Sequence, residues 1–368
     1  MIADLIVHGA LMLYAISFMM GLATIFTWVE RKQSAVMSDR IGANRCYVRV
    51  PFTNVRFVAM GLFHAMADGG KLLLKENFTP LAYDRLCYNL APWLVAIPVL
   101  IVFAIIPFGD TLAVGGRSYA LQVAQLDAGI LVVLALSGIG SLGTMLAGWS
   151  SNNKFSLMGA ARAASQMISY EVAMGFAVLS MVVTYGTLDL GGMVRWQSQW
   201  LGDVVPAWGI FVQPVAFLLF VTACIAENKR VPFDLPECES ELVAGYFTEY
   251  TAMKMGLFWL SEFIEIVVVS ALAVTLFLGG YGLPGLTQAG LALPGSVTWS
   301  LPQWAVAALQ VGAFSLKTFL VGCFMIQVRW TLPRVRYDQL MAFGWRLLLP
   351  LAAVNLVATA VIRWLAAQ

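Results

Sequence analysis

Five carboxylates lie within the nineteen residues 232–250, "PFDLPECESELVAGYFTEY", of a chain that is 60% hydrophobic and only 11% charged. They are Asp234, Glu237, Glu239, Glu241 and Glu249. If the stretch is helical after Pro236, Glu237 and Glu241 share one face at spacing i, i+4. Apolar residues such as Phe233, Leu242 and Tyr246 give the stretch a core of its own. This pattern favours partly buried carboxylates that hold protons beside a membrane surface; the alternative is a solvated acidic loop.

Four ionisable residues fall inside long apolar runs, where a charge costs about 2.5–3.5 kcal/mol on insertion scales. They are Glu171, Glu262, Glu265 and Lys317. Glu262 and Glu265 are three residues apart on one helix face, so each carboxylate raises the proton affinity of the other. Lys317 is expected to be the counter-ion of one of these carboxylates. The alternative for Glu265 and Lys317 is a purely structural ion pair.

The elements that must position these residues are membrane-spanning helices. Apolar runs of about twenty residues cross lipid as helices, because lipid offers backbone amides no other partner. Eight runs lie near 3–29, 92–108, 127–148, 167–186, 208–227, 254–279, 303–328 and 346–365. We therefore expect one all-α polytopic membrane domain over 1–368, with about eight transmembrane helices, an interfacial amphipathic helix and structured cytoplasmic loops. No repeat or linker divides the chain.

The basic residues predict the orientation of these helices, because cytoplasmic loops carry an excess of Lys and Arg. The segments 30–91, 149–166, 228–253 and 329–345, with the adjoining span edges, hold all but four of the 22 Lys and Arg. The exceptions are Arg117, Arg195, Lys317 and Arg363. These four segments are therefore expected on the cytoplasmic side, and both termini on the other.

Five cysteines without a C-x-x-C pair indicate no disulfide framework and no iron–sulfur or zinc site, so any redox metal is expected to belong to a partner. The net charge of +2 gives no indication of nucleic-acid binding.

Residues 54–76 show helical periodicity within the first of these loops. His64, Asp68, Lys71 and Lys75 recur at spacings of four, three and four, with apolar residues opposite. This indicates an amphipathic helix at the membrane surface or against the bundle, with a purely structural interfacial helix as the alternative. His64 and Asp68 could pair as a proton donor; otherwise His64 is a neutral interfacial residue.

Three long motifs closely resemble one family. They are "GWSSNNKFSLMGAARAASQMISYEVAMG" (148–175), "AENKRVPFDLPECESELVAGYFTEYTAMK" (226–254) and "VRWTLPRVRYDQLMAFGWRLLLPLAAVN" (328–355). The family is the H-type membrane subunit of NADH:quinone oxidoreductase, the counterpart of subunit 1 of mitochondrial complex I. The resemblance implies a subunit that helps form the quinone chamber and couples quinone reduction to proton pumping, a translocase function.

The resemblance also implies roles for individual residues. The proton path and acidic funnel of the family correspond to Glu171, Glu227, Asp234, Glu237, Glu239, Glu241, Glu249, Glu262 and Lys317. The quinone chamber corresponds to Glu30, Arg31, Arg40, Asn44, Arg45, His64, Asp68, Lys71 and Phe233. The chain departs from the family pattern at Ala43, at His64 and at Glu265, which is an acid that the pattern does not contain.

The resemblance further implies quinone as substrate and no cofactor bound by this chain, with FMN and iron–sulfur clusters in partner subunits. The expected partners are the peripheral-arm subunits of the quinone site, small membrane subunits and the lipid bilayer of a bacterial inner membrane. Two alternatives are a membrane subunit of an energy-converting hydrogenase and a free-standing secondary transporter. The motifs "TEY" and "RYDQLMAFGW" argue against the first, and the absence of inverted repeats in the sequence argues against the second.

Overall fold

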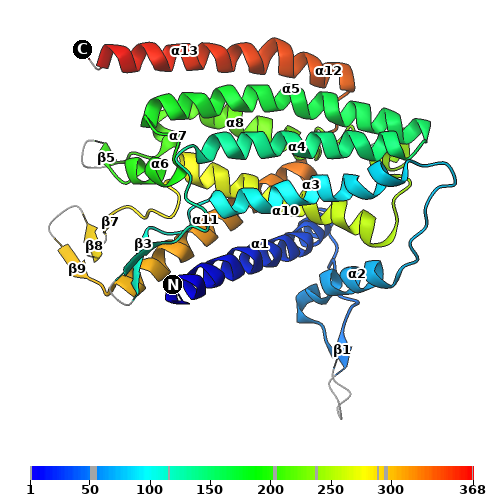
Figure 1. Ribbon diagram of the computed structural model, residues 1–368, viewed down its shortest axis with the longest axis horizontal. Helices are drawn as coiled ribbons and strands as arrows, with labels where there is room; N and C mark the ends of the chain where they lie inside the picture. The colour runs from blue at the N-terminus through cyan, green and yellow to red at the C-terminus, as the bar shows by residue number, and fades with distance from the viewer. Residues whose placement is uncertain are drawn as a thin grey trace.

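The computed structural model describes residues 2–49, 56–114, 117–201, 205–236, 239–287, 290–293, 297–366 and 368. The chain folds into a bundle of long helices, with short two- and three-stranded antiparallel sheets in the connections (Figure 1). Both termini lie at one end of the bundle, and the helix α2 (Phe63–Leu74) lies beside the other end. The expected all-α polytopic membrane fold is confirmed.

Seven helical segments of the described chain are long and apolar enough to cross a membrane. They are α1 (Ile2–Met37), α3 (Arg85–Ile105), α4 (Gly129–Ser150), α5 (Lys154–Tyr185), α10 (Ala252–Phe277), α11 (Gln303–Thr331) and the continuous stretch of α12 (Tyr337–Ala342), η3 (Phe343–Leu348) and α13 (Leu349–Ala366). In the last stretch η3 is a π-helical turn.

The eighth expected span, 208–227, is interrupted. A single turn, α7 (Gly209–Val212), is separated by the non-helical Gln213 from α8 (Pro214–Glu227). The physical reason is Pro214, which disfavours helical backbone at the residue before it and is itself suited to the first helical position. α8 is apolar but only 14 residues long.

Two other boundaries differ from the expectation. The segment 149–166 is almost entirely helical, because α4 ends at Ser150 and α5 begins at Lys154. The Asn153 side chain accepts a hydrogen bond from the amide of Phe155 at 3.0 Å and so caps α5. The predicted helix 54–76 is also shorter: β1 (Val48–Arg49) pairs with β2 (Arg56–Phe57), a 3₁₀ turn η1 (Ala59–Gly61) follows, and only then does α2 begin.

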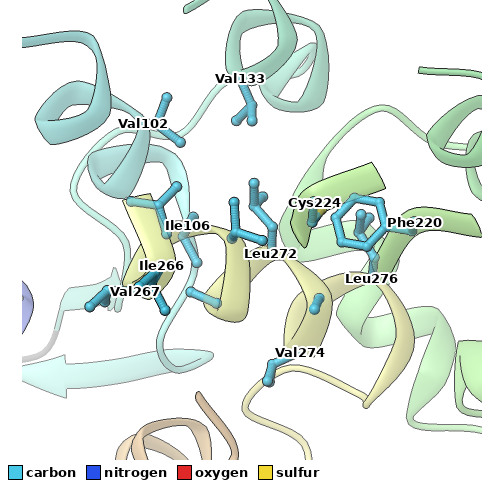
Figure 2. Packing of buried hydrophobic residues seen from close by; sticks show 14 of the residues in the cluster. Val102, Ile106, Val133, Phe220, Cys224, Ile266, Val267, Leu272, Val274 and Leu276 are labelled. Carbon is cyan, nitrogen blue, oxygen red and sulfur yellow. The ribbon is translucent and has the colours of Figure 1, made fainter. Parts of the chain in front are cut away.

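The core is centred on α10, which has the highest share of buried residues among the spanning helices. Figure 2 shows Leu272 and Leu276 of α10 packed near Phe220 and Cys224 of α8. On another side of α10, Ile266 lies close to Ile106, which follows α3. Because α10 carries Glu262 and Glu265, both carboxylates are held in the centre of the bundle rather than towards lipid.

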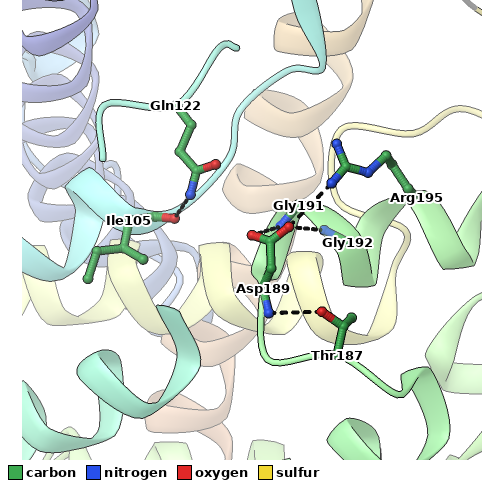
Figure 3. Close-up of polar contacts among 7 residues, drawn as sticks. All are labelled: Ile105, Gln122, Thr187, Asp189, Gly191, Gly192 and Arg195. Carbon is green, nitrogen blue, oxygen red and sulfur yellow. Dashed lines mark hydrogen bonds and ion pairs between the residues drawn. The ribbon is translucent and has the colours of Figure 1, made fainter. Parts of the chain in front are cut away.

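The end of the bundle that carries the termini contains short antiparallel sheets and one short helix. These are β3 (Thr111–Val114) with β4 (Arg117–Ala120), α6 (Leu190–Gln197), β5 (Trp200–Leu201) with β6 (Val205–Pro206), and the sheet of β7 (Leu286–Thr287), β8 (Gly290–Leu293) and β9 (Val297–Ser300). Figure 3 shows Asp189 capping α6: Oδ1 accepts from the amide of Gly191 at 3.1 Å and Oδ2 from that of Gly192 at 2.7 Å.

Candidate functional site

The segment between α8 and α10, residues 228–251, is fixed against α5 by a buried glutamine. Gln166 Nε2 donates hydrogen bonds of 2.7 Å to the carbonyl oxygens of both Ala226 and Phe233. The Phe233 ring is buried, with its centroid 5.8 Å from that of Tyr170 and 6.3 Å from that of Phe343. Phe233 therefore lies inside the protein and anchors the segment at the end of the bundle.

The same segment approaches α5 closely at a glycine pair. A side chain at Gly159 would place its Cβ within 2.7 Å of the Cα of Gly245, so the contact requires glycine. Nearby, the Ser156 hydroxyl donates to the Tyr246 carbonyl at 2.9 Å. The Tyr246 hydroxyl in turn donates to Glu262 Oε1 on α10 at 3.0 Å. One buried tyrosine thus joins the acidic segment to an intramembrane carboxylate.

Three carboxylates of this segment have partners from other elements. Asp234 accepts from Arg334 and Glu241 from Arg162, both at 2.6 Å, and Glu249 accepts from Asn153 Nδ2 at 2.6 Å. Burial raises the pKa of Asp234, while Arg334 lowers it in part. The segment is therefore cross-linked to its surroundings rather than a freely solvated loop.

The helix expected after Pro236 is largely absent from the described part of this segment. The chain forms only a four-residue turn, α9 (Glu239–Leu242), and a 3₁₀ turn, η2 (Gly245–Phe247). Glu237 and the side chain of Glu239 lie outside the described part of the structure. The predicted alignment of Glu237 with Glu241 therefore stays a prediction.

Glu30, at the end of the most apolar part of α1, lies in a buried cluster of charges. Its carboxylate forms ion pairs with Arg230 and, at 2.5 Å, with Arg329 of α11. The Arg230 guanidinium also lies over the Phe263 ring, 4.5 Å from its centroid. This cluster joins α1, α10, α11 and the start of the acidic segment.

The residues expected to line the quinone entrance lie around α2 and the end of α1. Asp68 of α2 forms an ion pair with Arg31 of α1, and His64 Nδ1 lies 3.1 Å from the carbonyl oxygen of Gly61. The structure therefore does not support the hypothesis that His64 pairs with Asp68, because the Asp68 carboxylate pairs with Arg31 of α1 instead. The remaining predicted residues are Lys71 of α2 and, between α1 and β1, Arg40, Asn44 and Arg45.

A small cavity inside the bundle brings further ionisable groups together. It has a volume of about 60 Å³ and is lined mainly by apolar side chains, with Glu227, Lys229, Glu265 and Ser137 as polar members. The Ser137 hydroxyl donates to Glu171 Oε1 at 2.9 Å. This exceeds the roughly 10–15 Å³ that a cavity needs to hold a water molecule, so the cavity has room for water. Glu227 and Glu265 thus line one cavity, and Glu171 adjoins it through Ser137.

Lys317 is not part of this group, so the expectation that it neutralises an intramembrane carboxylate is wrong. Its ammonium donates to the carbonyl oxygens of Leu278, Gly280 and Gly282 at 2.8, 3.1 and 2.7 Å and lies 4.7 Å from the Trp208 ring centroid. These carbonyls follow the C-terminus of α10, where the helix dipole attracts a cation. Glu262 and Glu265 are more than three turns away along the same helix.

Sequence reasoning missed three residues that contact or adjoin a carboxylate or its supporting segment, namely Lys229, Gln166 and Asn153. It named Tyr246 only as a core residue and not as a donor to Glu262. The sequence does show that Lys229 lies two residues after Glu227 at the end of an apolar run, and this spacing could have indicated a cation close to the buried carboxylate. Within the described residues, no group of three or more His, Cys, Asp or Glu side chains is arranged to hold a metal ion.

Comparison of the sequence with known proteins identifies the family of this chain. The family model described as NADH dehydrogenase matches residues 10–360. The second H subunit of the NADH-quinone oxidoreductases of Geobacter sulfurreducens is 42% identical over 97% of this chain and 96% of its own length. The first H subunit of Cytophaga hutchinsonii is 41% identical over 92% of this chain and 91% of its own length. The H subunit of Thermomicrobium roseum is 40% identical over 95% of this chain and 93% of its own length. The chain therefore belongs to the family of H subunits of NADH-quinone oxidoreductase, which are membrane subunits of complex I.

Proposed function

We propose that this chain helps form the quinone-binding chamber of a proton-translocating NADH:quinone oxidoreductase and couples quinone reduction to proton pumping through buried carboxylates. The names of its relatives support the quinone reaction rather than a hydrogenase. The chain acts as a single membrane domain in a bacterial inner membrane. Its segments 30–91, 149–166, 228–253 and 329–345 face the cytoplasm.

The observation that carries the coupling role is the series of ionisable groups that runs from the acidic segment into the bundle. Tyr246 connects the segment to Glu262, and one cavity joins Glu227 and Glu265 to Ser137, which binds Glu171. Buried carboxylates of this kind change protonation when a nearby charge changes. A purely structural bundle has no need for so many acids in its apolar interior.

Quinone reduction supplies the change in charge. Adding two electrons and two protons to a quinone creates negative charge that nearby groups must neutralise. In the proposal, FMN and iron–sulfur clusters of partner subunits deliver the electrons, and peripheral-arm subunits complete the chamber. The residues of this chain respond electrostatically and pass the change towards small membrane subunits and the pumping subunits.

The contacts around α2 are consistent with the chamber wall. Arg31 and Asp68 tie α2 to α1, while large apolar side chains remain exposed nearby: Met66 is 71% and Leu73 70% exposed. A surface that combines exposed apolar side chains with basic residues suits a lipid interface and an apolar substrate with a polar head. In this proposal, Arg40, Asn44, Arg45, His64 and Lys71 lie along the entrance.

The test uses the assembled complex in membrane vesicles, with Glu171→Gln, Glu227→Gln and Glu262→Gln made singly and together. We expect NADH:quinone reductase activity to fall less than proton pumping, because the substitutions interrupt the path rather than the electron-transfer chain. Assembly is checked by NADH oxidation with a soluble acceptor. If the triple variant assembles and pumps with the normal number of protons per electron, the coupling role is refuted.

A further inference from the structure

The side chain of Lys229 is buried, although no backbone carbonyl of the described residues accepts a hydrogen bond from its ammonium. It directly follows Asn228, the C-cap of α8, and has a φ of +52°, a conformation that disfavours a residue with a Cβ. The side chain is only 2% exposed, and within the described part of the chain its Nζ has no hydrogen-bond partner. The ring of Tyr246 lies 5.3 Å from Nζ.

The contrast with Lys317 shows what is unusual about this ammonium. Lys317 is satisfied by three backbone carbonyls, as expected of a cation that caps a helix. Lys229 instead lines the internal cavity together with the carboxylates Glu227 and Glu265. A buried ammonium without hydrogen bonds is costly unless opposite charge or water meets it. Carboxylates and space for water are what this cavity offers.

The other ionisable groups near the cavity have partners elsewhere, so Lys229, Glu227 and Glu265 are the charged groups that line it. Arg230 is held by Glu30, and Glu262 receives the hydrogen bond from Tyr246. Glu171 reaches the cavity through Ser137, and the Cys224 thiol lines the wall. Lys229 is thus the cation that lines the cavity together with Glu265 and Glu227.

We propose that Lys229 is a fixed cation that lets Glu265 and Glu227 share one exchangeable proton across the cavity. With the ammonium charged, one carboxylate ionised and the other protonated, the cluster has no net charge. A proton leaves the carboxyl oxygen of Glu265, passes through cavity water and binds a carboxylate oxygen of Glu227. One O–H bond breaks and one forms, so the net charge stays at zero. The transfer therefore avoids creating an unbalanced charge in the apolar interior.

This step rests on the proposed coupling role and adds Glu265 and Lys229 to it. Glu265 is the acid that the family pattern did not lead us to expect, and it lies one helical turn from Glu262 on the same face. It therefore extends the path from the Tyr246–Glu262 contact to the cavity. Without Lys229, a second carboxylate there would repel Glu227.

The test is a double-mutant cycle in the assembled complex, using Lys229→Met, Glu265→Gln and the double variant. Lys229→Met leaves two carboxylates without a cation. Glu265→Gln leaves Lys229 permanently paired with Glu227. We expect each single variant to lower proton pumping at least about tenfold and the double variant to fall no further than the single variants, because both substitutions disable the same proton-sharing step. The pH optimum of pumping should move to higher pH in Lys229→Met and return in the double variant.

Two further variants keep the outcome interpretable. Lys229→Arg retains a fixed cation, so it should keep most of the pumping even if Lys229→Met fails to assemble. Cys224→Ser changes the same cavity wall without removing a charge and should resemble wild type. Additive effects in the cycle, wild-type pumping in either single variant, or an assembled Lys229→Arg complex that does not pump would each overturn the proposal. Normal pumping by Glu171→Gln, by contrast, counts against the general relay and leaves the coupling in the cycle measurable.

Discussion

Replacing Lys317 by methionine should weaken the fold of this subunit without changing the number of protons pumped per electron. The methionine side chain retains most of the apolar contacts, but the three hydrogen bonds to the carbonyls of Leu278, Gly280 and Gly282 are lost. The contact of the ammonium with the Trp208 ring is lost as well. The substitution therefore isolates the role of the charge.

The magnitude follows from these contacts. A hydrogen bond to a charged group contributes about 1.5–3 kcal/mol, so three such bonds set an upper limit of about 9 kcal/mol. Adjacent bonds are not additive, water reaches part of the half-buried site, and removing the ammonium also removes its desolvation cost. We expect a net loss of about 2–3 kcal/mol, or a factor of about 30–150 in the folding equilibrium.

The assay is thermal inactivation of the purified complex, together with the amount of subunit assembled in the membrane. The midpoint of inactivation should fall by several degrees, while pumping per electron in the surviving complex stays normal. Lys154→Met is the matched control: Lys154 is exposed on α5, and its loss should change stability by less than about 0.5 kcal/mol. A stable Lys317→Met complex with fewer protons pumped per electron would refute the structural role and restore Lys317 to the proton path.

Three other predictions concern the acidic segment. Tyr246→Phe removes the hydroxyl that donates to Glu262 and should change the pH profile of pumping while leaving assembly intact, measured in vesicles; an unchanged profile contradicts a link between them. Arg162→Gln breaks an ion pair with Glu241, which is 56% exposed. The free energy of unfolding, followed by thermal inactivation, should therefore fall by less than about 1 kcal/mol, and by less still in high salt. A larger loss that does not depend on salt would contradict this. The pKa of Asp234 is raised in the folded chain, so Asp234 stabilises the protein less as pH rises above the ordinary pKa of 3.8. The inactivation midpoint of Asp234→Asn should therefore fall less with rising pH than that of the wild type. Parallel curves of midpoint against pH for the two proteins would contradict this.

The length and composition of the apolar runs were enough to predict most of the helices. Seven of the eight expected spans are helices of sufficient length, because lipid leaves an apolar backbone no alternative to internal hydrogen bonds. The boundaries were less predictable. α5 begins at Lys154, well before its apolar run, because Asn153 caps it and the tertiary packing buries small residues such as Gly159 and Ala160.

Local breaks were harder to place than the helices themselves. Gln213 interrupts the span near 208–227, although its neighbours are apolar. The amphipathic pattern of 54–76 continued the helix too far towards its N-terminus, where the described residues form β2 and η1 instead. Periodicity reports which side chains share a face, but backbone pairing with another strand competes for the same residues.

The sequence by itself determined that this is a helical membrane protein, that acids lie in its apolar interior, and which family its motifs resemble. Only the tertiary structure decided which charges meet. Glu30 and Arg329 are 299 residues apart and form an ion pair, Asp68 pairs with Arg31 rather than His64, and Lys317 binds carbonyls rather than a glutamate. Coulomb energies and hydrogen bonds depend on distances of a few ångströms. Those distances are set by how the helices pack and by where each helix ends, which spacing along one chain segment does not reveal.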